Sequence, residues 1–391
     1  MQWIGDVAHQ DEVLALANEV VASPRAGVNP RTEADFLWHA AMRYLIHGDR
    51  ARFHELTEEV AALAEHTQEP GVLLRPLVQV VIEQTLDGDL ENALESTQSL
   101  IHRADEMGIG MLGRVQAYSW SLPIRLYLGA LDDRAATDFN EKSWREQIIN
   151  LPTYAMRGDT ARAEEVLEQF MARLPPTNAH DATNVTWLVL ALEGAILLVD
   201  RTSAEVLRQR LAPSARLGGE PHAFSIVGRL FGDAARVCGD PKAARVYYER
   251  ALGVADSMQH RPEIALLHLN LAKLLPRAEA EAHLDRATPA LESMRMRPAL
   301  EHALALRSIV AGDPLTARER EVAALLASGF SNRAIAERLV ITEGTAEVHV
   351  KHIMNKLGLT SRTQVAVWAS KHGIVSVGSL SSASPPTQSI R

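Results

Sequence analysis

Four expected turns of this 391-residue chain share a Gly-Asp pair followed by a helix rich in alanine, and this pattern constrains the fold more than any other feature. Glycine readily adopts the left-handed conformation that ends a helix, and aspartate can cap the helix that follows. The spacings between successive pairs are 40, 70 and 81 residues, which correspond to about one, two and two lengths of a helical repeat. The pairs therefore predict successive helix pairs over the first 310 residues, as an α-solenoid or, alternatively, as a non-repeating helical bundle. The four pairs are Gly48-Asp49, Gly88-Asp89, Gly158-Asp159 and Gly239-Asp240.

Composition supports an all-α protein. Helix formers (Ala, Leu, Glu and Arg) recur throughout, whereas runs of β-branched and aromatic residues are scarce. The single cysteine, Cys238, excludes an internal disulfide and a zinc site built from cysteines, and it favours a reducing compartment.

No segment has the pattern of a membrane span or a secretory signal. Residues Met1 to Ala17 lack a basic start followed by an apolar core. The most apolar stretch, Val185 to Val199, contains Glu193 and is shorter than the ~20 residues that a spanning helix requires. We expect that stretch to be a buried helix, and the protein to be cytoplasmic with no membrane partner.

The last part of the chain carries the start and stop signals of four short helices. The first and the fourth begin with the capping-box pattern of Ser or Thr followed three residues later by Glu or Gln. A tight turn at residues 340–342 separates the second helix from the third, which is the arrangement of a helix-turn-helix. We expect the helices to run from Thr316 to Ser328, from Ser331 to Leu339, from Glu343 to Leu357, and from Ser361 to Gly373.

The third of these helices has two different faces. At 100° per residue, one stripe is apolar and should face the core, and it consists of Ala346, Val350, Ile353 and Leu357. The opposite stripe consists of Gly344, Val348, Lys351 and Asn355, flanked by Glu347 and His352. This stripe could be an ordinary solvated face. In a DNA major groove, however, Val348 could contact a thymine methyl group and Lys351 could donate to guanine, while Thr345 could reach a phosphate.

The segment from Leu315 to Ala369, LTAREREVAALLASGFSNRAIAERLVITEGTAEVHVKHIMNKLGLTSRTQVAVWA, resembles the LuxR/FixJ/GerE-type helix-turn-helix family over essentially the full family module. The resemblance implies double-stranded DNA as a partner, a homodimer on DNA, and an ion pair between Glu319 and Arg362. The fourth helix would carry the dimer contact, with Val367 as a candidate. The chain departs from the family pattern at Ala346, where valine is usual, but this position belongs to the core stripe. The expected DNA-binding residues are Arg333, Thr345 and Lys356 at phosphates, and Glu347, Val348, Lys351 and Asn355 on the face toward the bases.

The distribution of charge fits a DNA-binding segment on an acidic body. The chain has a net charge of −9, but the segment from Pro314 to Gly373 has eight basic and five acidic residues, a net +3. The remainder therefore carries −12. Local attraction of the basic segment to phosphate would be combined with repulsion of the body from nonspecific DNA.

The body has a resemblance of its own, which extends loosely from about Trp38 to Leu306. The stretch from Gly239 to Leu275 resembles the tetratricopeptide-like (TPR-like) region of large ATP-dependent LuxR-type regulators. Those relatives usually carry an ATPase domain, whereas no GxxxxGK[ST] phosphate-binding loop occurs here. We expect three parts: residues 1–310 as an irregular TPR-like solenoid, residues 311–374 as the LuxR-type helix-turn-helix domain, and residues 375–391 as a disordered Ser/Pro-rich tail.

The sequence favours a transcription regulator over an enzyme. The motif Gly108-x-Gly110-x-x-Gly113 follows an expected helix instead of a strand, so it predicts helix ends and not a nucleotide site. No catalytic group or cofactor site is predicted. No metal site is predicted either, because His349 and His352 have no third ligand nearby in the sequence. The body is expected to bind a peptide, protein or small-molecule effector. The alternative is a TPR-type interaction scaffold with vestigial DNA binding.

Overall fold

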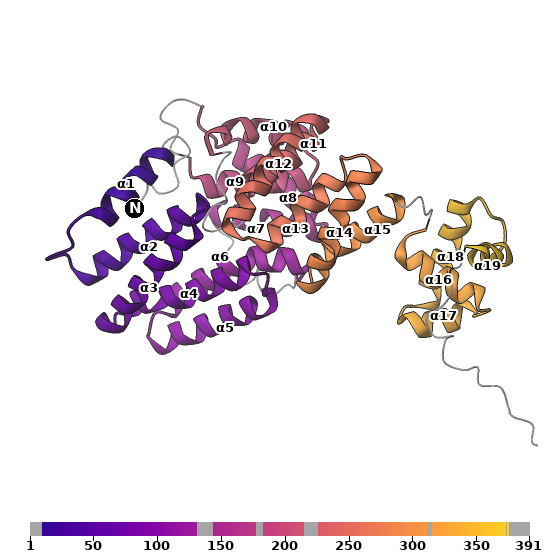
Figure 1. Ribbon diagram of the computed structural model, residues 1–391, viewed down its shortest axis with the longest axis horizontal. Coiled ribbons are helices and arrows are strands. Elements are labelled where there is room, and N and C mark those ends of the chain that lie inside the picture. Colours follow the sequence, from indigo (N-terminus) through magenta and orange to yellow (C-terminus); the bar gives the residue numbers. More distant parts are fainter. Residues whose placement is uncertain are drawn as a thin grey trace, which may run out of the picture. The chain divides into compact units, whose positions relative to one another are not determined.

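The fold is entirely helical. The computed structural model describes residues 10–130, 144–176, 183–214, 226–310, 315–372 and Ile374. The described residues form nineteen α-helices and no β-strand (Figure 1). The all-α prediction is therefore confirmed, while the predicted tail at 375–391 lies outside the described residues.

The chain divides into two compact units. The first, here called the helical body, spans Met1–Leu300, and the second, the C-terminal unit, spans Glu301–Arg391. Helix α15 (Arg297–Val310) crosses the division. The helices of the body are α1 (Gln10–Ala22), α2 (Pro30–Ile46), α3 (Arg50–Thr67), α4 (Pro70–Leu86), α5 (Leu90–Glu106), α6 (Gly110–Leu128), α7 (Trp144–Arg157), α8 (Thr160–Met171), α9 (Val185–Leu197), α10 (Arg201–Arg210), α11 (Val227–Val237), α12 (Pro241–Met258), α13 (Arg261–Ala272) and α14 (Arg277–Ser293).

Consecutive helices of the body pack against one another in two runs, from α1 to α6 and from α7 to α14. Helix α4 also contacts α2 and α6, and α9 contacts both α7 and α11. Helix α9 is enclosed by its neighbours, because Leu188, Val189 and Leu192 have no exposed surface. This confirms the prediction of a buried helix for most of that stretch, whereas Leu197 and Val199 at its end are exposed. The assignment of the body to a TPR-like repeat stays a prediction.

The four Gly-Asp turns have the predicted backbone. Their glycines all adopt positive φ, from 76° to 90°, where L-residues with a side chain are strained. The aspartate side chain caps the next helix, as predicted, at two of the four turns. Asp49 accepts a hydrogen bond from the Arg52 amide and Asp240 accepts one from the Ala243 amide. Asp89 and Asp159 occupy the same position, but their side chains accept no hydrogen bond from an amide of the next helix.

The turns of the first helix pairs lie against helices from the far end of the body. Arg261 donates to the carbonyl oxygen of Asp87 at 2.9 Å, and Arg295 pairs with Glu91 at 2.6 Å. A Cβ on Gly48 would lie only 2.3 Å from the Ser257 hydroxyl oxygen, so this turn approaches α12 closely. These contacts join positions up to 204 residues apart in the chain.

A buried polar cluster joins α6 to the later helices α11, α12 and α13. Arg229 on α11 donates to Glu263 on α13 at 2.6 Å and to Asp233 at 2.9 Å. The Tyr127 hydroxyl on α6 donates to the other oxygen of Glu263 at 2.9 Å, and Tyr248 on α12 donates to Asp233 at 2.7 Å. Burial alone would lower the pKa of Arg229, but the surrounding carboxylates raise it, so the guanidinium stays charged. Losing one member would leave a buried charge without its partner, which is costly.

The C-terminal unit has a core of its own. After α15 it contains α16 (Ala317–Ala327), α17 (Asn332–Leu339), α18 (Glu343–Leu357) and α19 (Arg362–Lys371). These boundaries match the four predicted helices within two residues. Helix α16 packs on α18 and α19, and α17 packs on α18. The shared core includes Leu315, Val322, Ile335, Val350 and Val365.

Candidate nucleic-acid interface

Helix α16 begins with a capping box and a buried carboxylate. Thr316 accepts a hydrogen bond from the Glu319 amide, and Glu319 accepts one from the Thr316 amide at 2.8 Å. The Glu319 side chain is only 5% exposed and accepts a further hydrogen bond from the Lys356 ammonium at 2.7 Å. Burial alone would raise the pKa of Glu319, but the hydrogen bonds from Lys356 and Thr316 outweigh it and the pKa is lowered. This carboxylate therefore ties the start of α16 to the last turn of α18.

The predicted ion pair between Glu319 and Arg362 is wrong. Glu319 is paired with Lys356, while Arg362 donates to the Phe330 carbonyl oxygen at 2.7 Å. The cause is the order of the helices around the core. The start of α16 meets the end of α18, and the start of α19 meets the loop before α17. Sequence reasoning chose the wrong cation because both partners are distant in the chain.

The turn between α17 and α18 is tight and exposed. Helix α17 ends at Leu339, and Val340 adopts φ 54° with 91% of its surface exposed. The left-handed conformation is unfavourable for a β-branched residue. The amides of Val340 and Ile341 both donate to the Ala336 carbonyl oxygen, which closes the turn.

The N-terminus of α18 holds two neighbouring hydroxyl groups. Thr342 caps the helix by accepting from the Thr345 amide at 3.2 Å. The two threonine hydroxyl oxygens lie 2.8 Å apart, so Thr342 can fix the orientation of the Thr345 hydroxyl. The amides of the first helical turn and the helix dipole make this end attractive to an anion such as a phosphate.

The two faces of α18 are arranged as predicted. Ala346 and Ile353 have no exposed surface and Val350 is 6% exposed, as the core stripe predicts. Leu357, its fourth member, is partly buried against the same core. On the opposite face, Glu347, Lys351, His352 and Asn355 are exposed, and Val348 is 50% exposed. The structure thus presents one valine among polar side chains on a helix that is anchored through its other face.

Most of the predicted DNA-binding residues are gathered on α18. Thr345, Glu347, Val348, Lys351 and Asn355 lie between its first turn and its last turn, and all are exposed. Lys356, also exposed, lies off this face and is bound to Glu319. Arg333 lies on α17, where its guanidinium pairs with Glu337 at 3.2 Å with the side chain 80% exposed. Their roles at DNA stay predictions.

Two residues that position this surface escaped the sequence reasoning. Thr342 could have been recognised, because a threonine directly before an amphipathic helix is a common cap. Arg318 on α16 donates to the Leu339 carbonyl oxygen at 2.7 Å, across 21 residues of chain. No pattern in the neighbouring sequence predicts that contact.

On α19, Val367 is 51% exposed, while Val365 and Trp368 complete the core.

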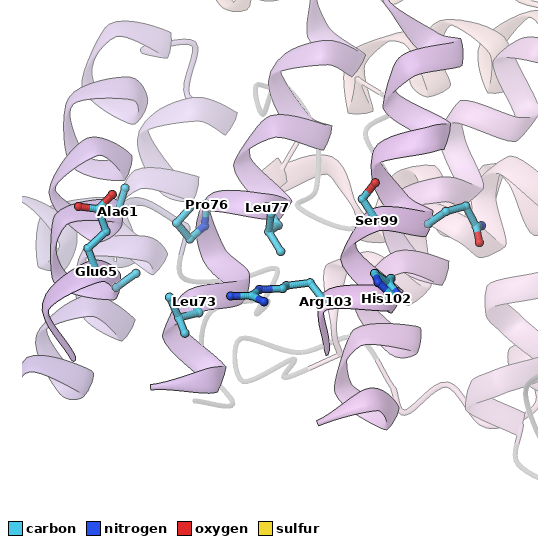
Figure 2. Close-up of a pocket in the computed structure, with 10 residues that line it drawn as sticks. Ala61, Glu65, Leu73, Pro76, Leu77, Ser99, His102 and Arg103 are labelled. Carbon is cyan, nitrogen blue, oxygen red and sulfur yellow. The ribbon is translucent and has the colours of Figure 1, made fainter. Parts of the chain in front are cut away.

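The helical body carries a groove formed by α3, α4 and α5, with a volume of about 720 Å³. Figure 2 shows Leu73, Pro76 and Leu77 on the middle helix, with Glu65 on one side and Arg103 on the other. Arg103 is also paired with Glu106 at 2.7 Å. The groove combines apolar side chains with one acidic and one basic edge. The remaining lining residues are Ala61, Ala64, Gln98, Ser99 and His102.

The part of the chain that the structure describes contains no group of three or more His, Cys, Asp or Glu side chains placed to hold a metal ion. None of its helices combines the length and the apolar character needed to cross a membrane. In the GxGxxG pattern the predicted helix ends are observed, because Gly108 follows the end of α5 and Gly110 begins α6.

Comparison with known proteins concerns the C-terminal unit. Residues 313–369 match the family described as "Bacterial regulatory proteins, luxR family". The chain is 50% identical over 64 residues to the transcriptional regulatory protein MctR of Rhizobium johnstonii, which covers 16% of this chain and 30% of that protein. It is 50% identical over 60 residues to the nitrate/nitrite response regulator protein NarL of Escherichia coli, covering 15% and 28% of the two chains.

A longer match, to the transcriptional regulatory protein LiaR of Bacillus subtilis, is 35% identical over 114 residues and covers 27% of this chain and 51% of that protein. The chain thus spans about half or less of the length of each of these three relatives. The similarity accounts for the helix-turn-helix and not for most of the helical body.

Proposed function

We propose that this chain, whose C-terminal unit contains a luxR-family helix-turn-helix domain, is a transcription regulator that binds specific DNA sequences through α18. The observation that carries the proposal is the outer face of α18, where a half-exposed valine lies among polar and basic side chains while the other face is buried. The similarity to MctR, NarL and LiaR, which are all named as regulators, supports the same function.

The proposed contacts follow from the chemistry of each side chain. Lys351 donates to guanine acceptors in the major groove, and Val348 packs on a thymine methyl group. Glu347 can accept from the cytosine amino group but cannot bind guanine acceptors. Asn355, one turn beyond Lys351, offers an amide that can bind adenine. Together these side chains would set the preferred sequence.

The phosphate contacts position the helix without reading sequence. Thr345 donates its hydroxyl proton at the N-terminus of α18, where the helix dipole also favours an anion. Arg333 and Lys356 contribute positive charge. Since each is already paired with a carboxylate, Glu337 and Glu319 respectively, each must exchange or share that partner at the DNA.

We further propose that two copies bind paired half-sites. A single small module buries a limited surface, and two-fold dimers are the usual solution for helix-turn-helix proteins. The exposed Val367 on α19 supports a contact between copies. The helical body would bind an effector and alter the exposure or pairing of the C-terminal unit, and the groove on α3, α4 and α5 is its candidate site.

The test is selection of DNA from a random duplex pool by the full-length chain. We expect enrichment of a defined motif with two related halves. Lys351→Ala should relax the preference at one position of the motif, whereas Lys371→Ala, which removes an exposed lysine on α19, should leave the motif unchanged. Failure to enrich any motif, together with tight binding of protein partners, would favour the interaction scaffold.

A further inference from the structure

The short helix α17 is held at both ends by arginines from other helices. Arg318 on α16 donates to the Leu339 carbonyl oxygen at the C-terminus of α17, at 2.7 Å. Arg362 on α19 donates to the Phe330 carbonyl oxygen in the loop before α17, at 2.7 Å, and approaches the Asn332 side-chain oxygen at 3.4 Å. The two guanidinium groups therefore bracket the helix.

These contacts satisfy groups that the helix cannot satisfy itself. The last carbonyls of a helix have no partner within it, and they form the negative end of the helix dipole. A guanidinium placed there makes a charge-assisted hydrogen bond, which is stronger than one between neutral groups. The other terminal nitrogen of the Arg318 guanidinium donates to Glu321, one turn away, at 2.6 Å, and this bond holds the guanidinium in place.

Helix α17 is oriented by the packing of its buried face, where Ile335 lies in the core, and by these external contacts. It has eight residues, about two turns, and so short a helix has little stability of its own. The backbone bonds to the Ala336 carbonyl fix the local shape of the turn, but they do not tie it to the rest of the domain. The Val340 side chain is 91% exposed and contributes almost no packing. Arg318 binds the carbonyl directly before Val340 and so connects the turn to α16.

We infer that Arg318 and Arg362 are positioning residues that hold α17, and through the turn at Val340 the helix α18, in the orientation that reads DNA sequence. This inference rests on the proposed function. Neither residue belongs to α18. Their effect should fall on discrimination between sequences, because a small rotation of α18 misaligns side chains at base edges more than it weakens nonspecific attraction to phosphate.

The experiment uses the full-length chain and the motif that it selects. Affinity for the motif and for random-sequence duplex is measured at several salt concentrations for wild type, Arg318→Met, Arg318→Lys and Arg362→Met, with Lys371→Met as the matched control. Each methionine change should weaken motif binding about tenfold and random-sequence binding less than twofold. Arg318→Lys should restore part of the loss, because an ammonium can still donate to the Leu339 carbonyl. The control should match wild type.

The salt dependence separates positioning from direct contact. A side chain that neutralises a phosphate lowers the slope of log affinity against log salt by about 0.9 when it is removed. An unchanged slope for Arg318→Met supports the inference, and a slope lowered by that amount overturns it. An unchanged ratio of motif to random-sequence affinity in variants that are folded at the assay temperature also overturns it. If Arg318→Met is unfolded, the ratio for Arg362→Met decides. If wild type enriches no motif, the proposed function itself fails, and this inference fails with it.

Discussion

Replacing Gly232 with alanine should destabilise the helical body, whereas the same replacement at Gly253 should stabilise it. Both glycines lie inside α-helices, Gly232 in α11 and Gly253 in α12. They differ in their surroundings. A Cβ on Gly232 would lie 2.2 Å and 2.4 Å from two ring carbons of Tyr248, while a Cβ on Gly253 would meet nothing within 4 Å.

The magnitudes follow from two opposing effects. Alanine favours a helix interior over glycine by about 1 kcal/mol, and this gain applies to both positions. At Gly232 the Tyr248 ring must also move by more than 1 Å, although it is fully buried and its hydroxyl is bound to Asp233 at 2.7 Å. Forced overpacking of this kind costs roughly 1–3 kcal/mol. We expect Gly253→Ala to gain about 1 kcal/mol and Gly232→Ala to lose up to about 2 kcal/mol, which is the packing cost less the gain in helix preference.

Calorimetric unfolding of the full-length chain measures both changes. In a domain of 150–250 residues, 1 kcal/mol shifts the unfolding midpoint by about 2–4 °C. The body is larger than such a domain, so we expect a shift near about 2 °C for each kcal/mol. The two variants should therefore move the body transition in opposite directions. The preference of alanine for a helix contributes equally to both variants. The difference between their free energies of unfolding therefore measures the packing cost at Gly232. Equal stabilisation by both changes would refute the close crossing of α11 and α12.

Three further predictions concern the C-terminal unit. Lys351→Ala should weaken binding to the selected motif by about 1–3 kcal/mol and relax one position, as measured by competition with single-substituted duplexes; unchanged preference would contradict the assigned orientation of α18. Glu319→Gln should lower the thermal midpoint of the unit more at pH 7 than at pH 3. Folding lowers the pKa of the Glu319 carboxylate, so its contribution to stability is present above the ordinary pKa of 4.5 and is lost as the pH falls through the pKa of the folded state. Equal effects at both pH values would argue against the ion pair with Lys356. Val340→Gly should stabilise the unit by up to about 1 kcal/mol and so raise the same midpoint, because relief of the left-handed conformation exceeds the added entropy of the unfolded chain. A lowered midpoint would contradict this.

Several features of the C-terminal unit could be predicted because they depend on neighbouring residues. The start of α16 follows from Thr316 and Glu319, which cap each other three residues apart. The end of α18 follows from Gly358, which adopts φ 63°. Alternation of apolar and polar residues along α18 also separated its buried face from its exposed face. These signals act within one or two helical turns, so the sequence displays them directly.

Pairing between charged groups was predicted less well. Glu319 was expected to bind Arg362, but Lys356 is the cation that meets it. Both candidates lie more than 35 residues away in the chain, and only the crossing of α16 and α18 decides between them. The Arg318 contact with the Leu339 carbonyl has the same origin. Its partner is a backbone oxygen, which is identical at every residue and carries no sequence signal.

The sequence by itself determined where the helices begin and end and which of their faces are apolar, since capping, glycine conformations and side-chain periodicity are short-range effects. The tertiary structure alone decided which helices meet. It brought Tyr127 to Glu263 across 136 residues, set the early turns against the late helices of the body, and chose the partner of each buried charge. Such choices depend on how whole faces fit and on the cost of burying charge, and both are properties of the assembled helices instead of any local segment.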